Sequence, residues 1–336
     1  MRLEAACEPK FARHETFHPR YGWVKKAFDA SLLNPPSFEQ EDAVLKLGVG
    51  KNMVKSIRFW GEAFGVLRNV PIEGSRVTTA RPTEFGQLLF ADDGWDPYSE
   101  LVGTPWILHW RLNAPGSVLP VWWLAMNEFS AVEFTPEEFE QFVVDRCRDF
   151  GSPKQTAVHK DVQCMLRMYS SGQSVRATFD DLVDCPFRDL NLMRPSPSEP
   201  GAYRFEIGPK PTLSPSILAF ACLDFVARAD SSARVINISR LATEHGAPGR
   251  VFKLPETEIV RLLELAARES NDFDVTSSAG AVQIAFTDEP SEIATKLLHA
   301  QFCKSTSDAA LPDGLSASGP QADQIWTPKT EQAQVA

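Results

Sequence analysis

Residues 47–67, LGVGKNMVKSIRFWGEAFGVL, constrain the fold more than any other part of this 336-residue chain. Gly48 and Gly50 can adopt backbone angles that are closed to other residues, so one helix can end there and another begin. Beyond the turn, apolar residues recur at three- and four-residue intervals, namely Met53, Val54, Ile57, Trp60, Phe64 and Leu67. This spacing predicts a helix with one buried stripe.

The other side of the same predicted helix is basic. Lys51, Lys55, Arg58 and Glu62 recur in the same rhythm, and residues 46–58 contain four basic side chains and no acidic one. Such a face suits the phosphates of nucleic acid, and the amide of Asn52 near the helix start can reach a base edge. The alternative is an ordinary amphipathic helix whose lysines are solvated.

The composition, with 43% hydrophobic and 23% charged residues, is that of a soluble globular protein. No run approaches the roughly 18 apolar residues of a membrane span, and the N-terminus lacks an apolar signal region. We therefore expect a cytoplasmic protein with no membrane contact. The six cysteines form no CxxC pair and are expected to be reduced. A chain of this length is expected to form more than one hydrophobic core.

Charge is unevenly distributed along the chain. The formal net charge of −10 argues at first against a nucleic-acid partner. However, residues 10–26, which include Lys25 and Lys26, carry a net +4 and residues 46–58 another +4, which leaves −18 on the rest. This polarity predicts a basic N-terminal surface on an acidic body that would repel DNA elsewhere.

The N-terminal unit, residues 1–112, is expected to resemble a winged helix. A helix over residues 41–47 and the helix after Gly50 are followed by residues 70–77 and 83–90, whose alternation predicts a short hairpin. Helix, helix and hairpin in this order are typical of a winged helix.

The middle region, residues 113–213, is expected to be helical and to contain an acidic loop. Tryptophan-rich segments at 106–112 and 121–129 are predicted to form the core that joins the two halves. Thr135 is followed by proline and by glutamate three residues on, which predicts a capped helix start. A further helix is expected over residues 156–169.

Residues 214–303 repeat the order of the first unit, with a turn at Gly246 and a hairpin around Gly280. This second winged-helix-like unit differs in charge, since residues 250–270 carry four basic and four acidic side chains. Residues 304–336 have little to bury and are expected to be disordered. The predicted fold is thus mainly α with short β hairpins (α+β), with two winged-helix-like units flanking a tryptophan-rich helical middle.

A metalloprotease motif is present by pattern only. His14, Glu15 and His18 match HExxH, in which two histidines bind zinc and the glutamate acts as a base. Pro19 pushes His18 away from helical geometry, and no motif places a third ligand, so we reject this function. Phosphate-loop and GxSxG motifs are also absent from the sequence.

A group of carboxylates in the middle region is the candidate catalytic site. It consists of Asp180, Asp181, Asp184 and Asp189, with Asp161 and Glu206 as candidates to join it. Clustered carboxylates can hold Mg²⁺ or Mn²⁺ for phosphodiester hydrolysis. The alternative, which the sequence favours, is a solvated acidic loop.

Five segments together resemble a known family. They are FARHETFHPRYGWVKKAFDA, LGVGKNMVKSIRFWGEAFGV, DVQCMLRMY, DCPFRDL and APGRVFKLPE, and they lie in this order between residues 11 and 290. They are similar to the SspB-type family, first described as a domain of unknown function, from DNA phosphorothioation systems. The resemblance implies a bacterial antiphage restriction-modification system with a cysteine desulfurase, an ATPase and a PAPS-reductase-like protein as partners. It implies that the protein binds double-stranded DNA and nicks one strand, but it identifies no catalytic residue.

Two hypotheses follow. The first is a DNA-binding component that acts as a metal-dependent nicking endonuclease, with Asp180, Asp181 and Asp184 as catalytic candidates. The second, favoured by the neutral second unit, is a non-catalytic winged-helix adaptor that docks sulfur-transfer enzymes on DNA. A transcriptional regulator fits less well, because the resemblance extends far beyond one binding unit. The predicted DNA contacts are Lys25, Lys26, Lys51, Asn52, Lys55 and Arg58.

Overall fold

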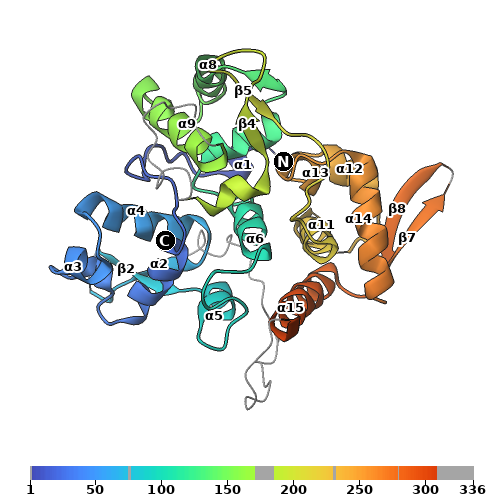
Figure 1. The fold of residues 1–336 in the computed structure, drawn as a ribbon, viewed down its shortest axis with the longest axis horizontal. Coiled ribbons are helices and arrows are strands. Elements are labelled where there is room, and N and C mark those ends of the chain that lie inside the picture. Colours follow the sequence, from blue (N-terminus) through green and yellow to red (C-terminus); the bar gives the residue numbers. More distant parts are fainter. Residues whose placement is uncertain (1, 75–76, 171–184, 230–231, 279, 309–336) are drawn as a thin grey trace.

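The computed structural model describes residues 2–74, 77–170, 185–229, 232–278 and 280–308. Its elements form three neighbouring groups around helix α6 (Gly103–Leu112), which lies near the centre of Figure 1. The N-terminal group is blue to cyan, the middle group green to yellow, and the C-terminal group yellow to red (Figure 1). Helices dominate, and three small antiparallel sheets accompany them in the described part of the chain. The predicted α+β class is confirmed.

The N-terminal group contains the predicted turn and amphipathic helix. Helix α3 ends at Gly48, whose φ of 64° is left-handed, and α4 begins directly after Gly50. Val54, Ile57 and Trp60 of the apolar stripe are buried. The elements of this group are α1 (Leu3–Ala6), α2 (Trp23–Leu32), η1 (Ser37–Glu39), α3 (Ala43–Leu47), α4 (Lys51–Ala63), β1 (Leu67–Pro71), β2 (Thr78–Pro82) and α5 (Glu84–Phe90).

The end of α4 corrects one prediction. The helix stops at Ala63, and Gly65 then adopts a φ of 70°. A side chain at Gly65 would clash with the guanidinium of Arg111, which lies 2.6 Å from where its Cβ would be. Leu67 therefore begins β1 instead of extending the helical stripe, although its side chain is buried.

The hairpin of this group lies earlier in the chain than predicted. Strand β1 pairs with β2 from Leu67 opposite Pro82 to Pro71 opposite Thr78. Residues 83–90, predicted as the second strand, contain α5 instead, because the Thr83 hydroxyl accepts a hydrogen bond from the backbone N–H of Gly86 and caps the helix.

The middle group surrounds a cluster of fully buried tryptophans that includes Trp106, Trp110, Trp122 and Trp123, as predicted. The capping box at Thr135 is also confirmed. A three-stranded sheet in the order β3-β5-β4 lies beside α9. The further elements are α7 (Pro120–Trp123), the π-helical turn η2 (Leu124–Glu128), β3 (Glu133–Phe134), α8 (Pro136–Arg146), α9 (Gln155–Tyr169), η3 (Pro186–Leu190), β4 (Met193–Pro195) and β5 (Tyr203–Phe205).

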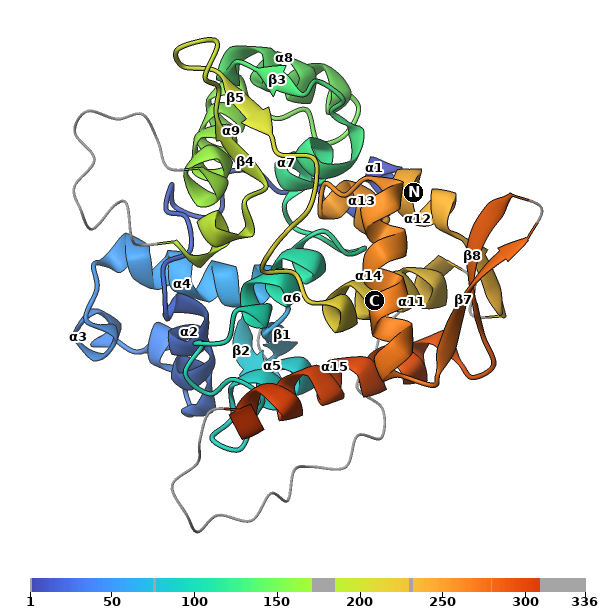
Figure 2. The same ribbon diagram turned by 45° about the vertical axis from the view of Figure 1, so that its right-hand side comes forward.

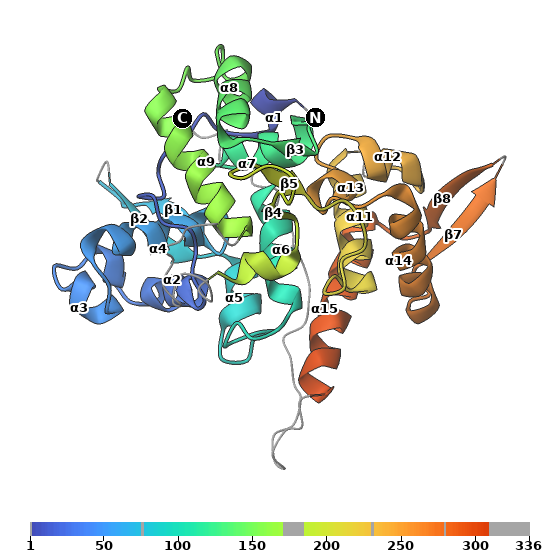
Figure 3. The same ribbon diagram turned by 45° about the horizontal axis from the view of Figure 1, so that its top comes forward.

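The C-terminal group contains the predicted second helix, turn, helix and hairpin, together with a strand that the sequence did not reveal. This strand, β6, pairs with β8, so the sheet order is β6-β8-β7. The β7–β8 hairpin projects from the body in all three ribbon views (Figures 1, 2 and 3). The elements are α11 (Pro215–Ala229), β6 (Val235–Asn237), α12 (Ile238–Thr243), α13 (Pro248–Val251), α14 (Glu256–Glu269), β7 (Phe273–Ser278), β8 (Ala281–Phe286) and α15 (Pro290–Asp308).

His109 of α6 joins the middle and C-terminal groups. Its Nε2 lies 2.9 Å from the carbonyl oxygen of Val251 in α13, and its Nδ1 lies 2.7 Å from the hydroxyl of Tyr169 in α9. A carbonyl only accepts, so Nε2 carries the proton and Nδ1 accepts from the tyrosine. Burial lowers the pKa of His109 to about 4.

One cluster of buried apolar side chains runs through all three groups, from Leu3 to Phe302, and a small second cluster lies under α3. The expectation of separate major cores is therefore wrong. Helix α15 continues to Asp308, so the predicted start of the tail at residue 304 is too early. Residues 309–336 lie outside the described part of the chain. No helix among the described residues is long and apolar enough to cross a membrane.

Candidate nucleic-acid interface

The start of α4 is an open, positively charged helix end. Gly50 is its N-cap and supplies no side chain to the first backbone N–H groups. A Cβ added at Gly48 or Gly50 would meet nothing within 4 Å, and Lys51 and Asn52 are both exposed. Backbone N–H groups and the helix dipole favour an anion at such an end.

Only part of the predicted basic face remains available. Lys55 is exposed, and its Nζ lies 3.2 Å from the carboxylate of Glu15. Arg58 is half-buried and surrounded by acceptors: its Nε lies 2.9 Å from Glu62, a terminal nitrogen 3.4 Å from Glu39, and the other 2.8 Å from the amide oxygen of Asn69. Two carboxylates therefore neutralise Arg58, whereas one carboxylate contacts Lys55.

The lysines of α2 make contacts within the N-terminal group. Lys25 forms an ion pair with Asp29, 2.5 Å away and one helical turn on. Lys26 donates to the carbonyl oxygen of Leu47, 3.0 Å away at the end of α3. Lys26 thus supports the turn that presents Lys51.

An extended arm, residues 8–22, passes between α4 and α9. His14 is fully buried, and its Nε2 lies 2.7 Å from Asp161 of α9, whose carboxylate also accepts from the backbone N–H of Ala12. Burial raises the pKa of Asp161, and the His14 contact opposes this effect. His14 therefore has a carboxylate partner from α9, and the residues of the HExxH pattern lie outside any helix.

The arm follows an unusual backbone path that exposes one arginine and contacts another on α9. Ala12, Glu15 and Thr16 have φ values of 54°, 51° and 68°, which are uncommon for these residues. This path exposes Arg13, and Arg167 of α9 donates to the carbonyl of Thr16 at 2.8 Å. Arg167 is distant from the arm in sequence, and no local pattern indicated that contact.

The carboxylate candidates divide into two sets. Asp180, Asp181 and Asp184 lie outside the described residues. The described ones have partners of their own: Asp189 accepts from the Tyr21 hydroxyl at 2.8 Å, Asp161 pairs with His14, and Glu206 pairs with two arginines. Within the described ranges, no three His, Cys, Asp or Glu side chains are grouped to hold a metal ion. The described carboxylates alone therefore do not fit a Mg²⁺ or Mn²⁺ site.

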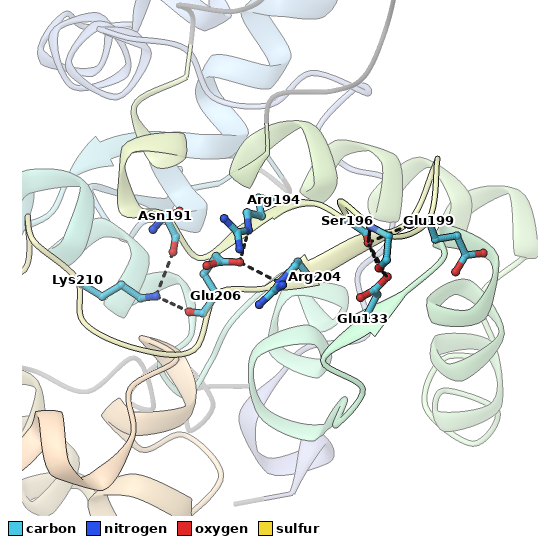
Figure 4. Close-up of polar contacts among 9 residues, drawn as sticks. Glu133, Asn191, Arg194, Ser196, Glu199, Arg204, Glu206 and Lys210 are labelled. Atoms are coloured by element: carbon cyan, nitrogen blue, oxygen red, sulfur yellow. Dashed lines mark hydrogen bonds and ion pairs between the residues drawn. The ribbon is translucent and has the colours of Figure 1, made fainter.

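A second basic surface lies on the sheet of the middle group (Figure 4). Arg194 of β4 and Arg204 of β5 both contact Glu206, at 2.5 and 3.1 Å. Nearby, the ammonium group of Lys210 is buried and donates to the carbonyl oxygens of Asn191 and Glu206. Burial lowers the pKa of Lys210 to about 8, and Glu206 opposes this effect.

Comparisons with known proteins identify the class of protein to which this fold and surface belong. The sequence matches the family described as "Protein of unknown function (DUF4007)" over residues 11–302. A solved structure described as "Magnesium ion-bound SspB crystal structure" is similar, with 36% identity, a TM-score of 0.85 and coverage of 91% of each chain. Another, "SspB crystal structure", has 36% identity, a TM-score of 0.85 and coverage of 91% of this chain and 92% of that chain. No curated protein matches. The chain belongs to the DUF4007 family and is of the SspB type, which confirms the resemblance seen in the sequence.

Proposed function

We propose that this protein is the DNA-binding component of a bacterial DNA phosphorothioation system with a role in antiphage defence. The observation that carries the proposal is the open N-terminus of α4, where no side chain caps the first backbone N–H groups and Lys51, Asn52 and Lys55 are exposed. A duplex would place backbone phosphates there, with Lys25, Lys26 and Arg58 supporting the helix and its turn. Membership of the SspB-type family supports the phosphorothioation context.

We further propose that the protein nicks one DNA strand with Mg²⁺ or Mn²⁺, since one similar structure is described as bound to magnesium. The metal would activate water and stabilise charge on the phosphate. Asp180, Asp181 and Asp184 are the candidates to hold it, and this assignment rests on their chemistry alone.

Supercoiled plasmid tests the nicking step. Purified protein with Mn²⁺ should convert it to open circles, and Asp180→Asn/Asp181→Asn/Asp184→Asn should abolish this conversion while leaving DNA binding intact. A control is Asp92→Asn/Asp93→Asn, an acidic pair that follows α5. If wild-type protein that is free of contaminating nuclease leaves the plasmid supercoiled, the nuclease assignment is wrong.

The second candidate function is a non-catalytic adaptor, and the C-terminal group favours it. The Arg261 guanidinium on α14 lies 2.6 Å from Glu258 on the same helix, so this face is charge-compensated. Strand β7 is at the edge of its sheet in the described part of the chain, and an edge strand can pair with a strand of another protein. The partners would be the cysteine desulfurase, the ATPase and the PAPS-reductase-like protein.

Phosphorothioate formation in cells separates the two candidates. An adaptor predicts that the aspartate triple variant retains modification and that a proline in β7, such as Thr276→Pro, removes it. A nickase predicts the loss of modification in the aspartate variant.

A further inference from the structure

Two arginines lie directly opposite each other on neighbouring strands of the middle sheet. Arg194 and Arg204 are register partners in the β4–β5 pair. Their side chains are 51% and 34% exposed, so a ligand can reach both. Like charges in directly opposite positions destabilise a sheet. A repulsive pair at an accessible position indicates that an anion belongs between them.

A single carboxylate, that of Glu206, forms ion pairs with both arginines. Oε1 of Glu206 lies 2.5 Å from Nε of Arg194 and 3.1 Å from Nε of Arg204. Neither contact is aligned as a hydrogen bond, since Oε1 of Glu206 and the buried Nε of Arg204 have no such partner among the described residues. One carboxylate is thus shared, with poor geometry, by two guanidinium groups.

The other nearby carboxylate is held mainly by two hydroxyls, and the charge of Arg204 is the smallest of the effects on its pKa. Glu133 is the register partner of Arg204 on its other side, but its carboxylate accepts hydrogen bonds from the hydroxyls of Ser196 and Ser198, each at 2.5 Å. Lys210 adds a buried ammonium group whose hydrogen bonds go to backbone carbonyls. In the group shown in Figure 4, two guanidinium groups therefore share the single carboxylate of Glu206, and the ammonium group of Lys210 is bonded to the backbone carbonyl of the same residue.

We propose that Arg194 and Arg204 form a binding site for a phosphate group, and that the Glu206 carboxylate occupies the place of that group in the free protein. Two guanidinium forks match the oxygens of phosphate in a way that one shared carboxylate does not. The phosphate belongs either to the DNA backbone, which rests on the proposed function, or to a free phosphate compound. Displacement of Glu206 by the ligand would make binding weaker than at a vacant pair of arginines.

Binding of a short labelled DNA duplex, measured by fluorescence anisotropy over a salt series, tests the site. Glu206→Gln removes the intramolecular competitor, so it should bind duplex about 5-fold tighter and steepen the salt dependence by about one phosphate contact. Arg194→Gln/Arg204→Gln should bind about 10-fold weaker. The matched control is Glu258→Gln, which also removes a mostly buried carboxylate paired with an arginine, and it should change affinity less than about 2-fold.

The variant Arg194→Lys/Arg204→Lys is a control for misfolding, because it keeps both positive charges and removes only the two guanidinium groups. It should remain folded by circular dichroism and bind weaker than wild type. Equal duplex affinities of Glu206→Gln and Glu258→Gln would exclude the DNA backbone as the source of the phosphate.

Thermal unfolding in inorganic phosphate, compared with chloride at equal ionic strength, tests the second source. A free phosphate ligand predicts that phosphate raises the melting temperature of Glu206→Gln more than that of Glu258→Gln. No difference in either assay would overturn the inference. If wild type binds no duplex, the proposed function fails while the phosphate measurement still decides this site.

Discussion

The two turn-helix units of this protein have a similar order of elements but use their turns differently. The turn between α3 and α4 is open, since a Cβ at Gly48 would meet nothing within 4 Å. The turn between α12 and α13 is buried against the middle group: the N–H of Gly246 donates to the side chain of Asn127 at 2.7 Å, and Arg250 donates to the Asn127 carbonyl at 2.7 Å. An open turn can meet a ligand, whereas a buried one serves packing.

Helix α4, which follows the first turn, and helix α14, which comes after the second turn and the short α13, differ in the same sense. Lys51, at the start of α4, is exposed on an uncapped helix end. Glu256 and Glu258 lie in the first turn of α14, where they complement the helix dipole, and Glu258 also holds Arg261. The element order alone therefore does not decide which unit contacts DNA, because that depends on which helix end remains open and positive.

The largest expected effect concerns His109, whose Nε2 donates to the carbonyl oxygen of Val251, just after the second turn. Its folded pKa of about 4 lies below the ordinary value of 6.5, so the unfolded chain binds more protons between these values. The neutral histidine therefore contributes about 3 kcal/mol to the free energy of unfolding above pH 6.5, and this contribution is lost as the pH falls to 4. Urea unfolding of wild type and His109→Gln across this range should show a difference that depends on pH. A constant difference would contradict the buried neutral histidine.

The glycines of the two turns should differ in their tolerance of a side chain. Gly246 has a φ of 85°, and its added Cβ would lie 3.2 Å from Trp123. Gly246→Ala should therefore cost about 2–3 kcal/mol, from backbone strain and crowding together. Gly48→Ala, with strain alone, should cost about 1 kcal/mol. If urea unfolding shows equal losses in the free energy of unfolding for the two variants, the two turns have equal room for a side chain.

The smallest expected effect separates the roles of two neighbouring cations on α4. Arg58→Met should lower the free energy of unfolding by about 1 kcal/mol, because it breaks contacts with Glu39, Glu62 and Asn69. It should change duplex affinity less than about 2-fold. Lys55→Met should leave the free energy of unfolding almost unchanged but lower the duplex affinity about 3-fold. Similar profiles for the two variants, by urea unfolding and anisotropy, would remove this distinction.

The sequence was most informative where structure depends on local spacing. The turn at Gly48 and Gly50, the stripe through Ile57 and Trp60, and the capping box at Thr135 all depend on residues a few positions apart, and all are confirmed. The start of α5 was missed because Thr83 favours a helix cap that strand-like alternation conceals.

The candidate site was harder to predict because its charges are balanced over long sequence distances. Lys55 meets Glu15 from 40 positions away, and His14 meets Asp161 from 147 positions away. A count of charges within residues 46–58 overestimated the positive charge at Arg58 for a simpler reason, because it left out Glu62, four residues on, and Glu39. The proximity of Arg194 and Arg204 follows from the strand register, which the sequence did not specify.

The most direct test of the central claim compares matched charge reversals on the two helices. Lys51→Glu/Lys55→Glu on α4 and Arg261→Glu/Arg268→Glu on α14 change the net charge equally, so a general electrostatic effect is the same in both. At about 0.1 M salt, the α4 variant should bind duplex DNA about 30-fold weaker and lose about two phosphate contacts from the salt dependence. The α14 variant should stay within about 2-fold of wild type. Equal losses in the two variants, or a larger loss in the α14 variant, would contradict the assignment of DNA contact to the open end of α4.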